Sequence, residues 1–585
     1  SYGDQGMSLE NPYWIINREM FTSKKKRYMF YANARYDILD WLNVAGRIRI
    51  DNTNTTTERR LHASTLQLHA QSDKGHYTKS LEEYQQTYGD VMLNINKMFG
   101  NFNLTANLGA SYEDHYTTGM GIGGKLFTVP NLFSAYNLDP SSGPGTESYS
   151  RNRTIGVFAS AELGYRSMVY LTLTGRNDWA SQLVNTNHPS VFYPSIGLSG
   201  VISEMMKLPE FVSFLKVRAS YTEVGSPISK QGLTPGTVTD DMIGGVINPN
   251  SIYPFPDFEP ERTKSYELGL NLRLWNNRIN IDATLYQSNT YKQLFLSSLP
   301  PTSGYSGFYV QTGNVRNRGI ELSIGYTDKF GSFGYSTNVT YTANENKILR
   351  MARGYVNPID KSTFDITELT LTEAGGVYLR EGGSIGDVYV KGILQRDRNK
   401  MLVEEGGGYQ IDRSQRIKIG SANPDYTIGW RNDFNWKGLN LGLLFNVRVG
   451  GIVTSQTQAY LDAYGVSKES LKARENGGVW VDGVQYDAEK YYNTIGGQNL
   501  MAYYAYSATN VRLREMSLSY MLPSKWFGEK LNISLSLTGH NLLMFYNKAP
   551  FDPELTANTG TYYQGFDYFM PPSLRSFGFG VKVNF

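Results

Sequence analysis

Two segments of this chain come closest to known chemical motifs, one rich in glycine and one acidic. Residues 119–125 (GMGIGGK) have the spacing of a dinucleotide fingerprint and most of a phosphate-binding loop. A phosphate-binding loop needs Ser or Thr after its lysine to hold Mg²⁺, and Leu126 stands there instead. The strand–turn–helix pattern that both motifs require is also missing. We therefore interpret the segment as part of a long, flexible loop.

The acidic segment runs from Asp397-Arg398-Asn399 to Glu404 and Glu405, which hints at a calcium loop. An EF-hand loop needs Gly at its sixth position and Glu at its twelfth, where this chain has Leu402 and Gly408. We expect a polar hairpin here, and a calcium site of another kind stays open.

Other catalytic chemistry finds little support. The six histidines lack the His-x-x-x-His spacing of a metal site, and no serine lies in a Gly-x-Ser-x-Gly elbow. Cysteine is absent, which excludes cysteine-based nucleophiles and metal ligands. Carboxylates are plentiful, so a glycosidase pair stays open, although nothing singles one out. We expect neither an enzyme nor a bound cofactor.

The elements that would position any functional side chain are β-strands. Phe577, Phe579, Val581, Val583 and Phe585 alternate with small or polar residues, and the same period of two recurs through the chain. One face of each strand is apolar, and the other carries Asn, Ser, Thr, Gly, Arg or Glu. This pattern predicts 17 strands, near 28–36, 41–51, 84–98, 102–113, 154–165, 168–177, 193–203, 214–224, 264–274, 278–289, 317–327, 333–344, 426–435, 439–449, 510–521, 531–540 and 577–585.

Connections between these strands alternate between short and long. The short ones are 37–40, 99–101, 166–167, 275–277, 328–332, 436–438, 204–213 and 522–530. The long ones are 52–83, 114–153, 178–192, 225–263, 290–316, 345–425, 450–509 and 541–576. Nearly every short connection has a large aromatic residue at its edge: Trp41, Phe99, Tyr165, Phe211, Trp275, Phe330, Trp436 and Trp526. Short periplasmic turns, long extracellular loops and an aromatic girdle are typical of outer-membrane barrels.

The composition agrees with an all-β transmembrane antiparallel barrel. The chain has 585 residues, is 13% aromatic and has a mean hydropathy of −0.39, with no apolar run of the 18 or so residues that a spanning helix needs. Alternating lipid-facing and lumen-facing residues give such an average. A net charge of +3 on 109 charged residues argues against a nucleic-acid partner.

Strand parity makes a prediction about topology. If the last strand ends in the periplasm, the strand at 28–36 descends, and residues 1–27 belong to an extracellular loop. Residues 28–585 would then be the C-terminal portion of a barrel. Bacterial barrels have an even strand number. The odd count therefore predicts further strands upstream of this sequence.

Several motifs, in this order, resemble the barrel of SusC/RagA-type TonB-dependent transporters. They are 173–179 (LTGRNDW), 193–197 (YPSIG), 215–221 (LKVRASY), 260–269 (PERTKSYELG), 313–322 (GNVRNRGIEL), 423–430 (NPDYTIGW) and 551–554 (FDPE). The resemblance implies a barrel of about 22 strands, about five of them outside this sequence. It also implies an N-terminal plug domain and a TonB box, which this sequence lacks, so that contact with TonB would run through the missing N-terminal region.

The resemblance further implies the outer membrane of a Gram-negative, Bacteroidetes-like cell and a SusD-like lipoprotein over the extracellular face. A dimer of transporter–lipoprotein pairs is a further option. The implied function is TonB-dependent import of a large nutrient. We place an oligosaccharide first and keep an oligopeptide importer, or a passive porin-like channel, as alternatives.

Sugar-binding sites use aromatic rings for stacking and polar groups for orientation. The long loops offer such groups, and we predict ligand contact for Asp178, Trp179, Tyr253, Tyr305, Phe308, Tyr309, Trp480, Asp482 and Tyr486. The alternative for each is that it packs its loop against a neighbour. We also expect the aromatic-rich loop 450–509, together with 345–425, to dock the lipoprotein. Loop 345–425 is the one candidate for a compact folded insertion, and its glycine-rich composition argues against that.

Overall fold

The computed structural model describes residues 10–143, 145–184, 186–226, 242–243, 246–247, 252–253, 258–298, 302, 304–356, 361–372, 377–528, 531–555 and 565–584. The chain divides into two compact units. Unit 1 comprises residues 1–166, 171–196 and 225–260, and unit 2 comprises residues 167–170, 197–224 and 261–585. No helix among the described residues is long and apolar enough to cross a membrane.

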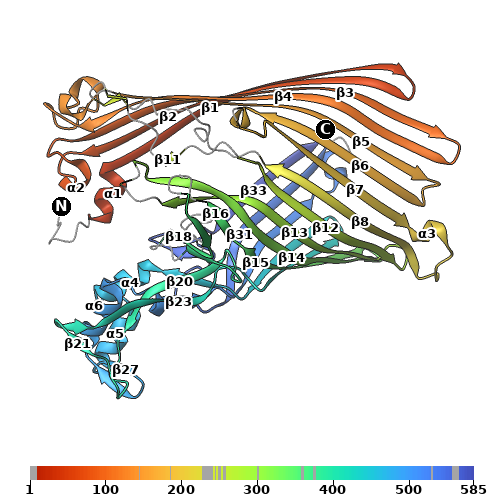
Figure 1. Ribbon diagram of the computed structural model, residues 1–585. Helices are drawn as coiled ribbons and strands as arrows, with labels where there is room; N and C mark the ends of the chain where they lie inside the picture. The colour runs from red at the N-terminus through yellow and green to blue at the C-terminus, as the bar shows by residue number, and fades with distance from the viewer. Residues whose placement is uncertain are drawn as a thin grey trace. The chain divides into compact units, whose positions relative to one another are not determined.

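Unit 1 is built on an antiparallel meander of very long strands. Each strand pairs with the next along the chain, in the order β1 (Glu19–Leu39), β2 (Leu42–His62), β3 (Gly75–Phe99), β4 (Phe102–Lys125) and β5 (Thr146–Tyr165) (Figure 1). Short helices α1 (Pro12–Arg18) and α2 (Gln67–Ala70) accompany this meander. The unit also contains η1 (Ala135–Asn137), η2 (Pro140–Ser142), η3 (Ser181–Leu183), most of β6 (Val169–Ala180), β9 (Met242–Ile243), β10 (Val246–Ile247) and β11 (Ile252–Tyr253).

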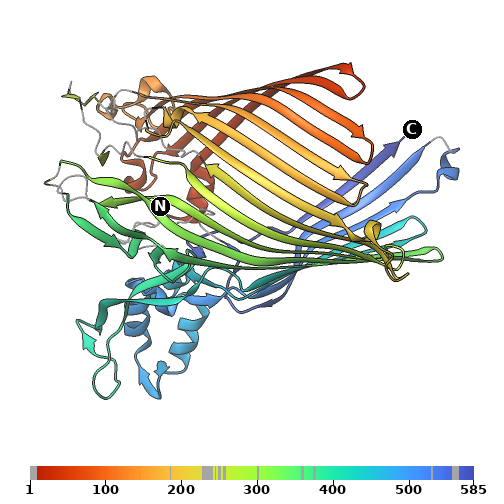
Figure 2. The same ribbon diagram turned by 45° about the vertical axis from the view of Figure 1, so that its right-hand side comes forward.

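Unit 2 contains a second series of antiparallel strands, in which each strand again pairs with the next. Its order is β12 (Glu261–Leu274), β13 (Ile279–Ser298), β14 (Gly307–Phe330), β15 (Phe333–Arg350), β24 (Tyr426–Trp436), β25 (Leu439–Val449), β30 (Asn510–Met521), β31 (Asn532–Asn547) and β33 (Ser576–Asn584). Figure 2 shows β12–β15 side by side. The strand β7 (Ser190–Val201) begins in unit 1 and ends in unit 2. Unit 2 also contains α3 (Ile202–Met205), most of β8 (Val212–Ser226) and η6 (Ser524–Phe527).

Each of the 17 predicted strands has a counterpart, so the period-two prediction is confirmed. The strands are longer than predicted: β3 has 25 residues, whereas we expected 84–98. Hydrogen bonding between strands continues beyond the alternating segment, where polar residues follow one another. The expected loops 52–83 and 114–153 are correspondingly shorter. Residues 19–27, expected in a loop, are the start of β1, and residues 1–9 lie outside the described part.

One loop interpretation was wrong. The glycine-rich segment 119–125 lies inside β4 and pairs with β3, from Gly119 opposite Glu82 to Lys125 opposite His76. Glycine is uncommon inside strands, so the segment reads as a loop in the sequence. Close cross-strand neighbours accompany the glycines here. A Cβ on Gly119 would lie 2.6 Å from Ser148 Oγ, and one on Gly121 would lie 2.8 Å from Thr146 Oγ1.

Short turns join strands at one end of each ladder. The turn between β24 and β25 has Lys437 at φ 46° and Gly438 at φ 86°, and positive φ at both central residues is the geometry that favours a two-residue hairpin. The other ends carry longer connections in both units, as the alternation of loop lengths predicts.

The described residues of the segments 345–425 and 450–509 fold together into what we call the loop region. It contains β16 (Ala352–Val356), β17 (Thr363–Ile366), β18 (Glu368–Thr372), β19 (Val377–Arg380), β20 (Asp387–Leu394), β21 (Glu404–Glu405), β22 (Gly408–Tyr409) and β23 (Ile411–Ser421). It also contains β26 (Ile452–Ser455), α4 (Gln456–Ala463), α5 (Lys468–Glu475), β27 (Val479–Val481), β28 (Val484–Tyr486), α6 (Ala488–Gly497), η5 (Met501–Tyr503) and β29 (Ala505–Ser507), with β32 (Phe566–Asp567) pairing beside β26. Figure 1 shows α4, α5 and α6 gathered near β20 and β23.

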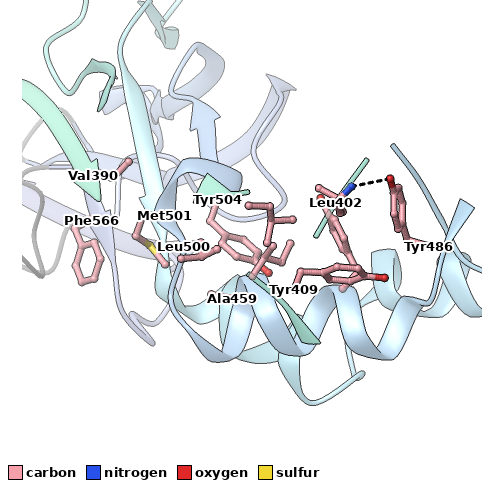
Figure 3. Packing of buried hydrophobic residues seen from close by; sticks show 12 residues of the cluster. Val390, Leu402, Tyr409, Ala459, Tyr486, Leu500, Met501, Tyr504 and Phe566 are labelled. Atoms are coloured by element: carbon pink, nitrogen blue, oxygen red, sulfur yellow. Dashed lines mark hydrogen bonds between the residues drawn. The ribbon is translucent and has the colours of Figure 1, made fainter. Parts of the chain in front are cut away.

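A common hydrophobic core holds the loop region together. Leu402 and Tyr409 from the first segment pack with Ala459, Leu500 and Tyr504 from the second (Figure 3). Segment 345–425 therefore takes part in a folded core, but it shares that core with the second segment and is not a compact insertion of its own. Its apolar residues are too widely spaced to show a core in the sequence, and the second segment supplies the missing half.

Candidate functional site

The polar face of β13, β14 and β15 carries a row of residues beside a cavity. The antiparallel register places Tyr286 opposite Gly319, and Gly319 opposite Asn344. Because successive side chains in a strand point to opposite faces, the neighbouring row that contains Leu285 lies on the apolar face. The cavity row therefore belongs to the face that the sequence predicts to meet water.

The Tyr286 side chain lies over Gly319, the residue opposite it on β14. A Cβ on Gly319 would lie 2.7 Å from the Tyr286 hydroxyl oxygen and 2.3 Å from the carbonyl oxygen of Ala343. The Tyr286 hydroxyl donates a hydrogen bond to Asn344 Oδ1 at 3.0 Å. The position of the ring therefore depends both on the missing side chain at 319 and on the amide at 344.

A chain of amides and hydroxyls extends from this row. Asn344 Nδ2 and Asn346 Nδ2 donate to Asn317 Oδ1 at 3.2 Å and 3.0 Å. The Ser384 hydroxyl donates to Asn346 Oδ1 at 3.0 Å, and Asn423 Nδ2 donates to Ser384 Oγ at 3.3 Å. These bonds tie the barrel strands to the loop region through uncharged groups.

The cavity beside these groups has a volume of about 750 Å³. Its lining consists of Tyr286, Gln287, Gly319, Asn344, Asn346, Ser384, Ser421, Asn423 and Pro424, the charged residues Arg318, Glu345 and Asp425, and the aliphatic residues Leu285, Ile320 and Ala343. Amides and hydroxyls both donate and accept hydrogen bonds. The lining therefore suits a ligand with many groups of both kinds.

The nine residues predicted to contact ligand are elsewhere, and the described lining of this cavity includes none of them. Asp178 pairs with Arg176, whose Nε lies 2.7 Å from Asp178 Oδ1, and accepts a hydrogen bond from the Tyr193 hydroxyl. The neighbouring Trp179 is exposed. Tyr253, in β11, is half-buried.

Two of the residues predicted to contact ligand lie at the start of β14, and their side chains are buried in the protein rather than exposed to a ligand. Phe308 and Tyr309 are buried, and the Phe308 ring packs against Tyr355 and Phe364 with centroids 5.7 Å and 6.2 Å away. Tyr305, just before β14, is half-buried. In this conformation the rings of 308 and 309 pack the loop, which is the alternative considered above.

The remaining three lie in the loop region. Trp480 is 62% exposed, and Asp482, in the turn between β27 and β28, forms an ion pair with Arg396. Tyr486 is buried in the common core, where its hydroxyl oxygen accepts a hydrogen bond from the Leu402 backbone N–H at 3.1 Å. Of these three residues, Trp480 alone presents an open ring.

The expected polar hairpin at Asp397 is confirmed. Asp397 Oδ1 accepts hydrogen bonds from the backbone N–H groups of Asn399 and Met401 at 2.8 Å and 2.9 Å, and Arg396 forms a bridge with Leu402. The carboxylate therefore caps a turn.

Elsewhere, the structure brings together a group that could hold a divalent cation. Glu10, Glu19 and His69 each offer a ligand atom, and these atoms lie within 4.8 Å of one another. Carboxylate and imidazole are common ligands for Zn²⁺ and Mn²⁺. The residues are far apart in the sequence, so no local spacing signals this group.

Rings from the loop region and from Phe569, just after β32, form an exposed aromatic stack. Tyr460 lies between Tyr464 and Phe569, with ring centroids 6.4 Å and 5.7 Å away and interplanar angles of 12° and 26°. Tyr464 and Phe569 are 43% and 54% exposed, and Val466 beside them is also exposed. We call these four residues the aromatic patch.

Long strands with one exposed apolar face, and a polar face that bears a cavity, define a transmembrane β-barrel. A protein-family model described as "TonB dependent receptor-like, beta-barrel" matches residues 2–441. The chain belongs to this family, and it lies in the outer membrane of a Gram-negative bacterium.

Curated relatives and solved structures agree with this assignment. TonB-dependent receptor P3 of Formosa agariphila is 25% identical over 99% of this chain and 60% of its own length. TonB-dependent receptor P26 of the same organism is 24% identical over 88% of this chain and 53% of its own length. The RagAB peptide importer in its open-open state has the same fold, with a TM-score of 0.81 and 19% identity over 100% of this chain and 63% of that chain. This chain thus spans about three fifths of the first curated relative.

Proposed function

We propose that the protein containing this chain imports, in a TonB-dependent manner, a nutrient too large for ordinary porins, and that this nutrient is an oligosaccharide. The observation that carries the proposal is the 750 Å³ cavity, whose lining brings together amides and hydroxyls beside apolar residues. Sugar hydroxyls donate and accept hydrogen bonds, as these side chains do. The Tyr286 ring supplies an aromatic surface against which a sugar face can stack.

A peptide is the second candidate. The fold likeness to the RagAB peptide importer covers the whole chain. Peptide backbones also match amide side chains, and Asp425 offers a charge that a neutral glycan does not need.

Ligand binding to the complete protein separates the two candidates. Oligosaccharide and oligopeptide mixtures are offered to the purified protein, and bound species are identified by native mass spectrometry. Asn344→Ala and Asn346→Ala should weaken binding of the true ligand by about five- to tenfold each, the usual net contribution of one hydrogen bond. Asn338→Ala, on the same β15 but outside the lining of the cavity, is the matched control.

If both classes bind equally well and independently of these asparagines, the cavity is not the binding site. Uptake that persists in cells without TonB would instead favour the passive channel.

The aromatic patch is our proposed dock for a SusD-like lipoprotein acting as a lid. Exposed tyrosine and phenylalanine rings are typical anchors of protein interfaces. A deletion within 450–509 would test this poorly, because Tyr491 and Ile495 belong to the common core. The better test replaces Tyr464 and Phe569 with serine and measures co-purification of the lipoprotein, with the exposed Tyr136→Ser, outside the loop region, as control. Equal yield from both variants would remove the patch as the dock.

A further inference from the structure

A polar cavity lies in unit 1, on the face of β3, β4 and β5 that elsewhere carries exposed apolar side chains. It has a volume of about 390 Å³ and is lined by Gln85, Thr87, Asp114, Tyr116 and Arg151. The strand register places Thr87 opposite Asp114 and Gln85 opposite Tyr116, so these side chains from β3 and β4 share one face. Arg151 on β5 is opposite Tyr116 and completes the group.

This face is continuous with the exposed apolar surface of the same strands. Two rows nearer the short turns, Val91 is opposite Ala110, which is opposite Val157. Val91 and Val157 are 59% and 43% exposed. In an outer-membrane barrel such an exposed apolar face meets lipid. The cavity therefore opens on the outside of the barrel, towards the membrane.

The strand lengths place the cavity at the level of the lipid headgroups. A tilted membrane strand needs about 9–11 residues to cross the hydrocarbon layer. Counted from the short-turn ends of β4 and β5 at Phe102 and Tyr165, Asp114 and Arg153 are each 12 residues along their strands. On β3, Thr87 is likewise 12 residues from Phe99. All three strands therefore leave the hydrocarbon at the row where the polar site begins.

Two arginines at this level share one carboxylate. Arg151 Nε and Nη2 donate to Asp114 Oδ1 and Oδ2 at 3.0 Å and 2.6 Å, and Arg153 Nε lies 3.4 Å from Asp114 Oδ2. The Arg151 and Arg153 side chains are 40% and 48% exposed, whereas Asp114 is mostly covered. The group keeps one positive charge in excess and presents guanidinium groups outward, so it attracts an anion.

We propose that this site binds the phosphate group of a phosphorylated glycolipid in the outer leaflet. Guanidinium groups form strong, often bidentate hydrogen bonds with phosphate. Gln85, Thr87 and Tyr116 offer donors and acceptors to the adjoining sugar, and the apolar rows below meet the acyl chains. A phosphate group, a sugar and acyl chains occur in this order along such a lipid.

The test uses the complete protein, freed of lipid in detergent, with purified lipid A, its dephosphorylated form and inorganic phosphate as probes. Lipid A should bind, and the double variant Arg151→Gln/Arg153→Gln should bind it at least about tenfold more weakly, as expected for the loss of charged hydrogen bonds. Dephosphorylated lipid A should bind the native protein as weakly as lipid A binds the variant.

Two controls keep a loss of folding apart from a loss of binding. Arg166→Gln removes the same charge from the short-turn end of β5 and should leave lipid A affinity unchanged. Arg151→Lys/Arg153→Lys keeps the charge and should bind with intermediate affinity. Equal affinity of the native protein and the glutamine variant would overturn the proposal. Inorganic phosphate that binds as tightly as lipid A would show a free-anion site and overturn the assignment to a lipid.

Discussion

Arg512 offers a sharp test of how the segment after β31 is fastened to the barrel. Its side chain, on β30, is only 3% exposed and reaches Asp552 Oδ1 at 2.9 Å and Glu554 Oε2 at 3.4 Å. Its Nε also donates to Asn510 Oδ1 at 3.0 Å. Replacing Arg512 with methionine leaves a covered carboxylate at Asp552 without this partner. Glu554 keeps the ion pair with Arg514 at 2.6 Å.

The magnitude follows from burial. Removing one partner of a buried ion pair costs about 3–5 kcal/mol. Because Glu554 keeps Arg514, we expect the lower value, about 3 kcal/mol, which corresponds to faster local opening by about a hundredfold. The exposed pair of Arg431 and Asp433, whose side chains are 45% and 43% exposed, should contribute about 0–1 kcal/mol. Arg431→Gln is therefore the matched control.

Hydrogen exchange of residues 547–555 in the intact protein measures this opening. Arg512→Met should accelerate exchange there by about a hundredfold, and Arg431→Gln by about fivefold at most, as an exposed ion pair predicts. Adding Asp552→Asn to Arg512→Met should recover part of the protection, because it removes the stranded charge. If Arg512→Met exchanges as slowly as the Arg431 variant, the buried network does not fasten this segment.

Acid should have a related effect. Burial would raise the pKa of the Asp552 carboxyl, but hydrogen bonds from Arg512, Ser573 and the Glu554 backbone hold that pKa below its usual value. A lowered pKa stabilises the folded state above the pKa of the unfolded chain, and this stabilisation is lost as the pH falls through the folded value. Protection of 547–555 should therefore persist at neutral pH and fade below about pH 4, near the reference aspartate value.

Three further outcomes are expected. Phe579→Arg should cost about 2–4 kcal/mol of barrel stability if Phe579 lies near mid-bilayer, whereas Lys582→Arg on the polar face should cost little, as urea unfolding in lipid would report. Gly319→Ala should displace Tyr286 and weaken ligand binding. Gly325→Ala should leave binding unchanged, because the nearest atom to an added Cβ there is 3.4 Å away. Equal affinities of the two variants would refute the role of Gly319. Burial raises the pKa of Tyr492 to about 12, so the loop region should keep its stability below about pH 10 and lose it as the pH rises towards 12, seen as protease sensitivity.

The barrel strands could be predicted because their pattern is local. Alternation at Phe577, Phe579, Val581 and Val583 is visible in the sequence, and the structure places these residues in β33 opposite Leu537 and its neighbours. Their lipid-facing orientation stays a prediction, and Phe585 lies outside the described residues. The extent of the strands could not be predicted, because polar residues beyond the membrane pair without alternating.

The cavity could be predicted only in part from the sequence. Tyr286 is an aromatic residue in an otherwise small and polar row, and Gly319 lies in a recognisable family motif. Only the register between strands shows that the two residues are neighbours. Loop aromatics such as Phe308 and Tyr486 are visible in the sequence, but their packing partners are not, because those partners come from other segments of the chain.

The shared core of the loop region has a consequence for the order in which the protein is built. Val390, Ala459 and Phe566 come from three separate segments, divided by the strand pairs β24–β25 and β30–β31. No single segment carries enough apolar surface to fold alone, and bringing distant segments together costs loop entropy before any contact repays it. Each segment therefore lacks the rest of its core until the strand pairs that follow it have formed. We therefore expect the loop region to become resistant to protease only after β31 has paired.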